Sequence, residues 1–121
     1  KVIFSGTLTS NGLKTEISKG NLNILKEGKN KKFIKKVKQI TYSSKLGTKR
    51  GQNIIFNTDR GVFRFINNKI TLVEIAQGVK LKEDIIKQIN FPIKISKNLK
   101  RIPKKIYLKK KIGLKKILIK K

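Results

Sequence analysis

The chain has 121 residues, enough for one modest domain or the end of a larger one, and a formal net charge of +26. It contains no Cys and no His, which excludes a disulfide framework, a thiolate metal site and a histidine base or metal ligand. No apolar run is long enough to span a membrane, and we expect no leader of signal-peptide type. We therefore expect a cytoplasmic, metal-free protein with no cofactor. Because the chain starts at Lys1 and not at Met, we expect further residues to precede it.

The first half of the chain predicts short strands joined by turns. Val2–Phe4 is an apolar run typical of a buried strand, and period-two alternation predicts strands at Leu13–Ser18 and Leu22–Leu25. A stretch rich in β-forming residues predicts another strand at Phe33–Ser43. The following ten residues, 43–52, have little apolar content and predict a loop.

Three further strands are predicted at Asn53–Asn57, Val62–Ile66 and Ile70–Ile75. The turns between them are Asp59–Gly61 and Asn67–Lys69, and Asn tolerates the positive φ that hairpin turns need. Successive strands with short connections pair with their neighbours, so we expect an antiparallel meander here.

After Gly78 the apolar period becomes helical. Leu81, Ile85, Ile86 and Ile89 are spaced as on one helix face, with two acids in the first turn, and the helix is expected to end before Pro92. Residues 93–121 alternate Lys clusters with Ile and Leu at no clean period. They predict an extended arm that lies over another part of the whole protein.

One loop combines groups suited to holding an anionic or carbonyl oxygen. It follows the first apolar strand and consists of Gly6, Thr7, Leu8, Thr9, Ser10, Asn11 and Gly12. Exposed backbone N–H groups and hydroxyls can bind such an oxygen. An ordinary strand-connecting turn is the alternative that composition alone leaves open.

The positive charge invites a nucleic-acid interpretation. The basic residues are 28 Lys and 4 Arg, however, and the chain is also rich in Ile and Asn, the bias that an A/T-rich genome produces. Nucleic-acid readers usually also use Arg, whose planar fork matches phosphates and guanine edges. We therefore expect no specific nucleic-acid partner and attribute much of the charge to mutational bias.

The segment Val2–Leu13 resembles Val-Val-Phe-x-Gly-Thr-Phe-Thr-Ala-Gly-Gly-Leu, a motif of the propionate/acetate branch of the family I CoA-transferases. Five further blocks resemble the same family in the same order: Glu27–Phe33, Val37–Ser43, Gly51–Gln52, Thr58–Phe65 and Leu72–Val79. Together they span roughly residues 2–95. Asn11 stands in place of a loop Gly, which the fold accepts if that position needs positive φ.

The resemblance implies an α/β fold, of which this chain is the C-terminal part: mostly antiparallel strands in a meander, one helix and a basic extended tail. Residues 1–95 would be the C-terminal portion of the CoA-transferase domain and residues 96–121 a basic tail or arm. The implied partners are an acyl-CoA and a carboxylate as substrates, the rest of the chain's own polypeptide, and further copies in a homo-oligomer.

The family's reaction, as the resemblance implies, passes through a glutamyl-CoA thioester on a Glu in a Glu-x-Gly element. The chain has no Glu-x-Gly, so none of its six acids can be assigned this role. We expect the catalytic Glu to lie upstream and the chain alone to be inactive. Gly6, Thr7, Thr9, Ser10, Asn11 and Gly12 are the candidates for bordering the CoA or acyl site.

Two alternatives belong to other classes. The chain could be a small basic nucleic-acid-binding module, although Tyr42 and Tyr107 are too few to form a base-stacking platform. It could also be an interaction domain left from a decayed enzyme. A Glu-x-Gly element in the sequence upstream would distinguish the enzyme from both.

Overall fold

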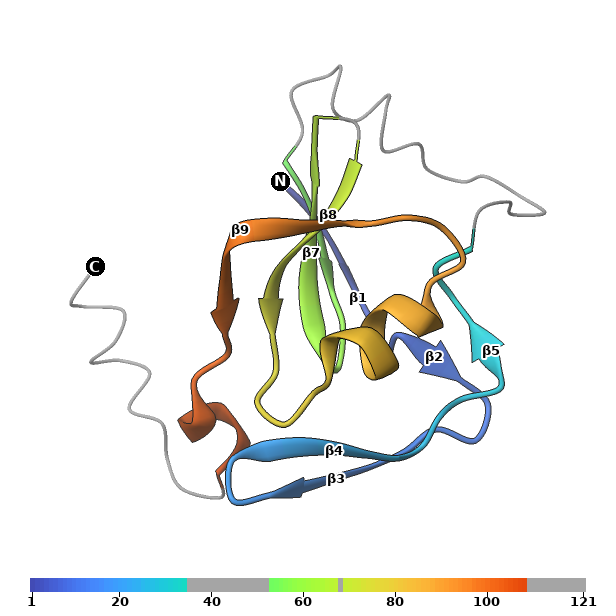
Figure 1. The fold of residues 1–121 in the computed structure, drawn as a ribbon, viewed down its shortest axis with the longest axis vertical. Helices are drawn as coiled ribbons and strands as arrows, with labels where there is room; N and C mark the ends of the chain where they lie inside the picture. Colours follow the sequence, from blue (N-terminus) through green and yellow to red (C-terminus); the bar gives the residue numbers. More distant parts are fainter. Residues whose placement is uncertain (35–52, 68, 109–121) are drawn as a thin grey trace.

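The centre of the structure is a five-stranded mixed sheet. The computed structural model describes residues 1–34, 53–67 and 69–108. The strands lie in the order β1-β6-β7-β8-β9 (Figure 1). Their bounds are Val2–Ser5 for β1, Ile54–Asn57 for β6, Gly61–Ile66 for β7, Lys69–Ile75 for β8 and Lys94–Arg101 for β9.

The middle of this sheet is the predicted meander. β6, β7 and β8 pair antiparallel with their sequence neighbours, which confirms the prediction made from the turn residues. Asn67 in the β7–β8 turn has a φ of 50°, the conformation for which Asn is suited. The turn chemistry therefore identified both the strands and their order.

The two outer strands are parallel to their neighbours. β1 pairs with β6 with Val2 opposite Ile54, and β9 pairs with β8 with Thr71 opposite Lys94. The arm predicted from residue 93 onward is extended at residues 94–101, but these residues form a strand of the main sheet, and Lys104–Tyr107 is a short helical turn. The expected division after residue 95 therefore falls inside β9.

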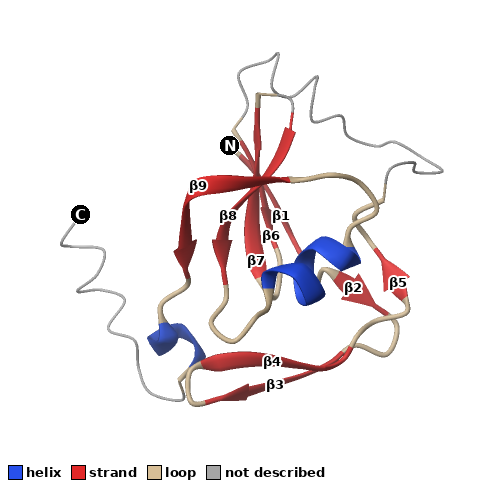
Figure 2. Ribbon diagram, in the orientation of Figure 1, coloured by secondary structure: helices blue, strands red, loops and turns tan. Residues whose placement is uncertain are grey.

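Two small ribbons lie beside the main sheet (Figure 2). β3 (Lys14–Ser18) and β4 (Asn21–Lys26) form an antiparallel hairpin, while β2 (Thr9–Ser10) pairs with β5 (Asn30–Lys31). A short helical turn, η3 (Lys104–Tyr107), packs against the β3–β4 turn, where a Cβ on Gly20 would come 2.9 Å from the Lys104 Cβ. The loop predicted over residues 6–12 therefore contains the two-residue strand β2.

The predicted helix is present at residues 81–88 but is irregular. It consists of a π-helical turn, η1 (Leu81–Ile85), followed by a 3₁₀ turn, η2 (Ile86–Gln88). In a regular α-helix the Asp84 carbonyl would accept the N–H of residue 88. Here it accepts a hydrogen bond from the Arg60 guanidinium, at 3.0 Å, and the Gln88 side chain donates to the Glu83 carbonyl. Side-chain donors therefore bind two carbonyls of this irregular segment.

The core lies between the sheet, the η1–η2 helix and the β4 ribbon. Its buried members are Leu8, Leu22, Phe63, Leu72, Ile75, Ala76, Val79, Ile85 and Ile89. Of the four apolar residues on the predicted helix face, Ile85 and Ile89 are buried, whereas Ile86 is 44% exposed. The helix therefore presents a narrower apolar stripe to the core than its sequence suggests.

The predicted strand at Phe33–Ser43 and the loop at residues 43–52 lie almost entirely outside the described residues. Phe33 itself is not in a strand. In the described part of the chain, no helix is long and apolar enough to cross a membrane. The fold is strand-rich with one short helix, in agreement with the architecture expected from the sequence.

The β3–β4 turn provides a test of this backbone. Lys19 and Gly20 have φ values of 52° and 80°, the pattern of a type I′ turn, which strongly favours Asn-Gly. Because a long side chain is strained at positive φ, Lys19→Asn is expected to raise the free energy of unfolding by about 1 kcal/mol. Urea denaturation measures this change. Lys14→Asn, an exposed strand position, is the control and should give no gain.

Candidate functional site

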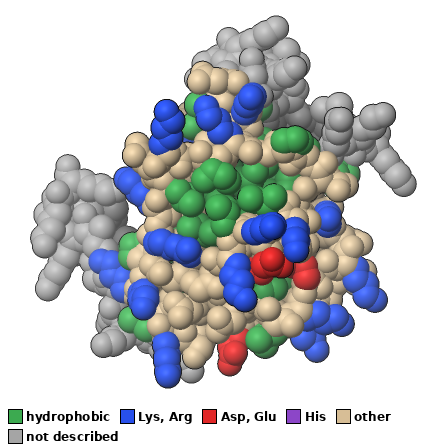
Figure 3. All heavy atoms as spheres, viewed as in Figure 1, with side chains coloured by type: hydrophobic (Ala, Val, Ile, Leu, Met, Phe, Trp, Pro, Cys, Tyr) green, Lys and Arg blue, Asp and Glu red, His purple; other side chains and the backbone are tan. Residues whose placement is uncertain are grey.

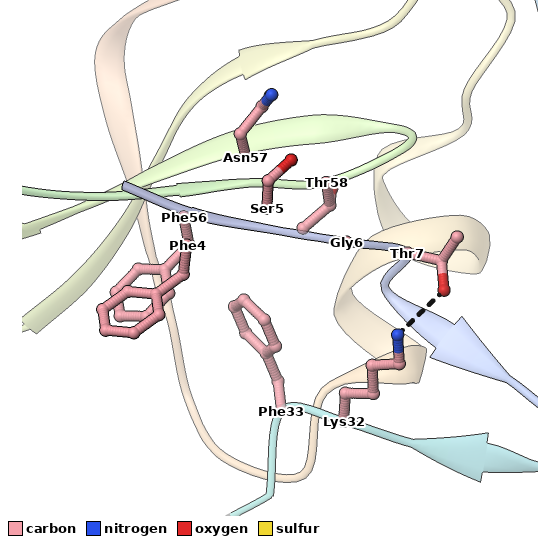
Figure 4. A pocket seen from close by; sticks show the side chains of 9 residues that line it. All are labelled: Phe4, Ser5, Gly6, Thr7, Lys32, Phe33, Phe56, Asn57 and Thr58. Atoms are coloured by element: carbon pink, nitrogen blue, oxygen red, sulfur yellow. Dashed lines mark hydrogen bonds between the residues drawn. The ribbon is translucent and has the colours of Figure 1, made fainter. Parts of the chain in front are cut away.

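A pocket lies at the carboxyl ends of the parallel strands β1 and β6. Its volume is about 170 Å³, and its lining comes from residues 4–7, 32–33 and 56–58 (Figure 4). In open α/β sheets, ligands bind in the crevice outside the carboxyl ends of the strands. The location is therefore the one at which a site is expected in this kind of sheet.

One wall of the pocket is aromatic. The Phe4 and Phe56 rings stack with centroids 5.3 Å apart, and Phe33 meets Phe56 edge-on at 5.8 Å. Phe33 also contacts the fully buried Phe63 at 5.0 Å. The wall is therefore continuous with the core, which holds Phe33 in place. Aromatic rings arranged in this way present a rigid apolar surface.

The other side of the pocket carries a cation. The Lys32 Nζ donates a hydrogen bond to the Thr7 hydroxyl, at 3.0 Å, and that hydroxyl donates to the Thr9 carbonyl, at 2.6 Å. Gly6 lies between the aromatic wall and Lys32 in Figure 4. Because Gly6 has no side chain, the space beside the ammonium group stays open.

A buried cluster of charges centred on Arg60 contacts the loop that follows β1. The Arg60 side chain is 0% exposed. Its Nη1 donates to the Glu27 carboxylate, at 2.8 Å, and to the Asp84 carbonyl, at 3.0 Å, while Nε lies 3.3 Å from Asp59 Oδ2. Nη2 lies 3.2 Å from the same Asp59 oxygen but without hydrogen-bond geometry. One guanidinium therefore joins three segments that are far apart in the sequence.

The two carboxylates of this cluster hold the loop that follows β1. Asp59 Oδ1 accepts the backbone N–H of Leu8, at 2.9 Å, and Glu27 Oε1 accepts the hydroxyl proton of Thr9, at 2.5 Å. The hydroxyl oxygen of Thr9 in turn accepts a hydrogen bond from the Gly28 N–H, at 3.0 Å. A Cβ on Gly28 would come 2.3 Å from the Ser10 carbonyl oxygen, so only glycine fits at this crossing. The start of the loop is therefore fixed from two sides.

The charges of the cluster stabilise one another. Burial alone would raise the pKa of the Glu27 carboxyl, but the hydrogen bonds from Arg60 and Thr9 outweigh it, and the pKa lies below its ordinary value of 4.5. Burial alone would lower the pKa of Arg60, whereas Glu27 and Asp59 raise it above its ordinary value. Both groups are therefore charged at neutral pH.

The structure separates the six predicted site residues into two groups. Gly6 and Thr7 line the pocket. The other four lie farther along the loop. Thr9 is buried and bonded to Glu27, and Ser10 of β2 pairs with Asn30 of β5. Asn11 and Gly12 form an exposed turn with φ values of 65° and 90°. The positive φ of Asn11 meets the condition under which Asn can replace a loop glycine.

Sequence reasoning missed Lys32, Phe33 and the Arg60 cluster. Apart from Asp84, they lie inside blocks that carried the family resemblance, Glu27–Phe33 and Thr58–Phe65, but both blocks were interpreted locally as turns or strand starts. The signal was there, since these two turns hold oppositely charged residues, Glu27 in one and Asp59 and Arg60 in the other. Among the described residues, no group of three or more acids is placed to hold a metal ion.

No protein-family model matches the chain. It is 42% identical over 113 residues to the acetate CoA-transferase YdiF of Escherichia coli K12, an alignment that covers 93% of this chain and 21% of that protein. It is also 42% identical over 114 residues to the caffeate CoA-transferase of Acetobacterium woodii, covering 94% of this chain and 22% of that one. The chain thus spans about a fifth of the length of these relatives.

Two crystal structures of the YdiF acyl-CoA transferase of E. coli O157:H7 share the fold. The apoenzyme matches with a TM-score of 0.89 and 41% identity, over 92% of this chain and 22% of that one. The thioester complex with CoA matches with a TM-score of 0.85 and 42% identity, over 88% of this chain and 21% of that one.

The Arg60–Glu27 pair predicts how stability depends on pH. Because the folded pKa of Glu27 lies below 4.5, its contribution is complete above pH 4.5 and is lost as the pH falls through the folded value. Glu27→Gln should lower the free energy of unfolding at pH 7 by roughly 3 kcal/mol and flatten its decline in acid. Denaturant unfolding between pH 2 and 7 measures both. Glu16→Gln, at an exposed position in β3, should change neither, and equal pH profiles for Glu27→Gln and the wild type would rule out this role.

Proposed function

Because the chain corresponds in sequence and in fold to the C-terminal part of CoA-transferases, we propose that it is the part of such an enzyme that borders the substrate site. The resemblance drawn from the sequence motifs is confirmed by the 42% identity to two CoA-transferases. The observation that carries the proposal is the extent of this match, over 93% of the chain, together with a pocket at the carboxyl ends of β1 and β6.

The proposed reaction transfers CoA from an acyl-CoA to a carboxylic acid through a glutamate outside this chain. The glutamate carboxylate attacks the acyl-CoA carbonyl, giving an acyl-glutamyl anhydride and the CoA thiolate. The thiolate then attacks the glutamyl carbonyl, forming a glutamyl-CoA thioester and releasing the first acid. The acceptor carboxylate reverses these two steps and leaves as the new acyl-CoA, which restores the glutamate.

This chain supplies none of the covalent chemistry in the proposal. Among the described residues no acid lines the pocket: Glu27 and Asp59 are engaged with Arg60 and the loop, and Asp84 binds the Lys80 N–H. Its part is to hold the loop after β1, with Gly6 and Thr7 at the pocket, against the CoA or acyl group. The thioester complex with CoA known for the E. coli relative supports the intermediate.

The partners follow from the same proposal. The enzyme takes an acyl-CoA and a carboxylate as substrates, and this segment contacts the rest of its own polypeptide within a homo-oligomer. On the face that Figure 3 shows, the Lys and Arg side chains are spread and do not gather in one stripe, so this face does not favour a nucleic-acid partner. The aromatic residues of the pocket also pack on one another.

A chimera tests the proposal. The matching C-terminal segment of E. coli YdiF is replaced by this chain, and CoA transfer from acetyl-CoA to propionate is measured. We expect the chimera to catalyse the exchange, YdiF lacking the segment to be inactive, and the 121-residue chain alone to give no turnover.

Two results would overturn the proposal. One is a chimera that folds and assembles like YdiF yet transfers no CoA. The other is sustained exchange by the isolated chain, because it would place the nucleophile among the residues present here.

A further inference from the structure

We propose that the pocket at the ends of β1 and β6 binds a small carboxylate with an apolar body, and that Lys32 binds its carboxylate group. The proposal rests on the proposed function, since it names the part of the substrate that this segment holds: the acid and not the nucleotide of CoA. Three properties of the pocket carry it, namely its size, its aromatic wall and its cation.

The size of the pocket selects a small ligand. Its volume of about 170 Å³ lies below the roughly 300 Å³ at which sites for drug-sized ligands begin. A short acyl chain or a single ring fills that space, whereas a nucleoside with its phosphates would extend out of it into solvent. The pocket therefore matches the acid that exchanges CoA better than CoA itself.

The wall selects an apolar body. Figure 4 shows the Phe4, Phe56 and Phe33 rings on the same side of β1 as Lys32, with the Ser5 and Asn57 side chains on the other side. A ligand in the pocket thus meets ring faces and edges and has few polar side chains to contact. Apolar groups gain free energy when they leave water for such a surface.

Lys32 selects a negative charge. An ammonium group has three protons to donate, and the Thr7 hydroxyl accepts one of them. Thr7 donates its own proton to the Thr9 carbonyl, so its oxygen serves Lys32 as an acceptor and holds the ammonium at the pocket. No carboxylate forms an ion pair with Lys32 within residues 1–34, 53–67 and 69–108, so the ligand can supply that partner.

Gly6 keeps the two halves of the pocket connected. A Cβ at this position would lie 3.7 Å from the Lys32 Nζ, an ordinary contact, so alanine fits without moving the backbone. The branched side chain of valine would extend further, into the space between the ammonium and the phenyl rings. Gly6→Val therefore fills the site without changing its charge.

The test uses the 121-residue chain and needs no CoA. Butyrate is titrated into the isotope-labelled protein, butyramide is the uncharged probe of the same shape, and binding is followed by the backbone amide shifts of residues 4–7 and 32–33. We expect saturable butyrate binding localised to these amides and binding of butyramide at least about tenfold weaker, because a charge-assisted hydrogen bond is lost.

Variants separate the pocket from the general positive charge. Lys32→Met and Gly6→Val should each weaken butyrate binding at least about tenfold. Lys29→Met removes the same charge from an exposed position outside the pocket and should leave the affinity unchanged. The proposal is wrong if Lys29→Met and Lys32→Met weaken binding equally, if butyramide binds as well as butyrate, or if the shifts spread over the lysines of the whole surface. These measurements involve no CoA transfer. The binding proposal can therefore fail while the YdiF chimera is active, and it can hold while the chimera is inactive.

Discussion

The structure depends on one buried cation, the guanidinium of Arg60. An ion removed from water costs several kcal/mol unless it is paired and hydrogen-bonded. Here the compensation comes from Glu27, from Asp59 and from the carbonyl of Asp84. Because these groups belong to the β4–β5 turn, the β6–β7 turn and the η1 helix, the charge is satisfied only when all three meet. The constraint on one side chain thus positions three parts of the fold.

The same cluster connects the core to the pocket. Asp59 and Glu27 each bind Arg60 on one side and the loop after β1 on the other, through the Leu8 N–H and the Thr9 hydroxyl. The loop in turn presents Gly6 and Thr7, and Thr7 holds Lys32. A buried interaction that touches no ligand therefore sets the geometry of the surface at which a ligand is proposed to bind. It also reaches the irregular helix, since Arg60 donates to the Asp84 carbonyl.

Local chemistry predicted much of the fold. Turn residues identified the β6–β7–β8 meander, alternation identified β3 and β4, and the period change after Gly78 located the helical segment. Contacts between distant residues were not predictable in this way. The parallel pairing of β1 with β6 joins residues about fifty positions apart, and β9 has too many Lys residues for its alternation to show. The order of the family-like blocks was informative about the whole chain where local patterns were not.

The candidate site was predicted in part, for a related reason. The loop Gly6–Gly12 was identified from its composition, but only Gly6 and Thr7 line the pocket. Thr9 has the same hydroxyl as Thr7 and lies two residues away, yet it is 0% exposed because β2 turns it toward Glu27. Lys32 and Phe33 follow β5 and reach the pocket because two hydrogen bonds hold this segment near η2. The Lys31 ammonium donates to the Lys87 carbonyl, and the Asn90 N–H donates to the Phe33 carbonyl. Composition reports which groups are available, whereas only the fold decides which of them meet.

The central claim is that Arg60 fixes the loop specifically. Amide hydrogen exchange at Leu8 tests it most directly, because the Leu8 N–H bonds to Asp59, which Arg60 holds. In Arg60→Lys the charge remains but one ammonium cannot reproduce the planar fork that serves Glu27, Asp59 and the Asp84 carbonyl together. We predict that Leu8 exchange then accelerates far more than exchange in the β7–β8 ladder. Equal acceleration at both places, or an unchanged Leu8 rate in the folded variant, would contradict the account.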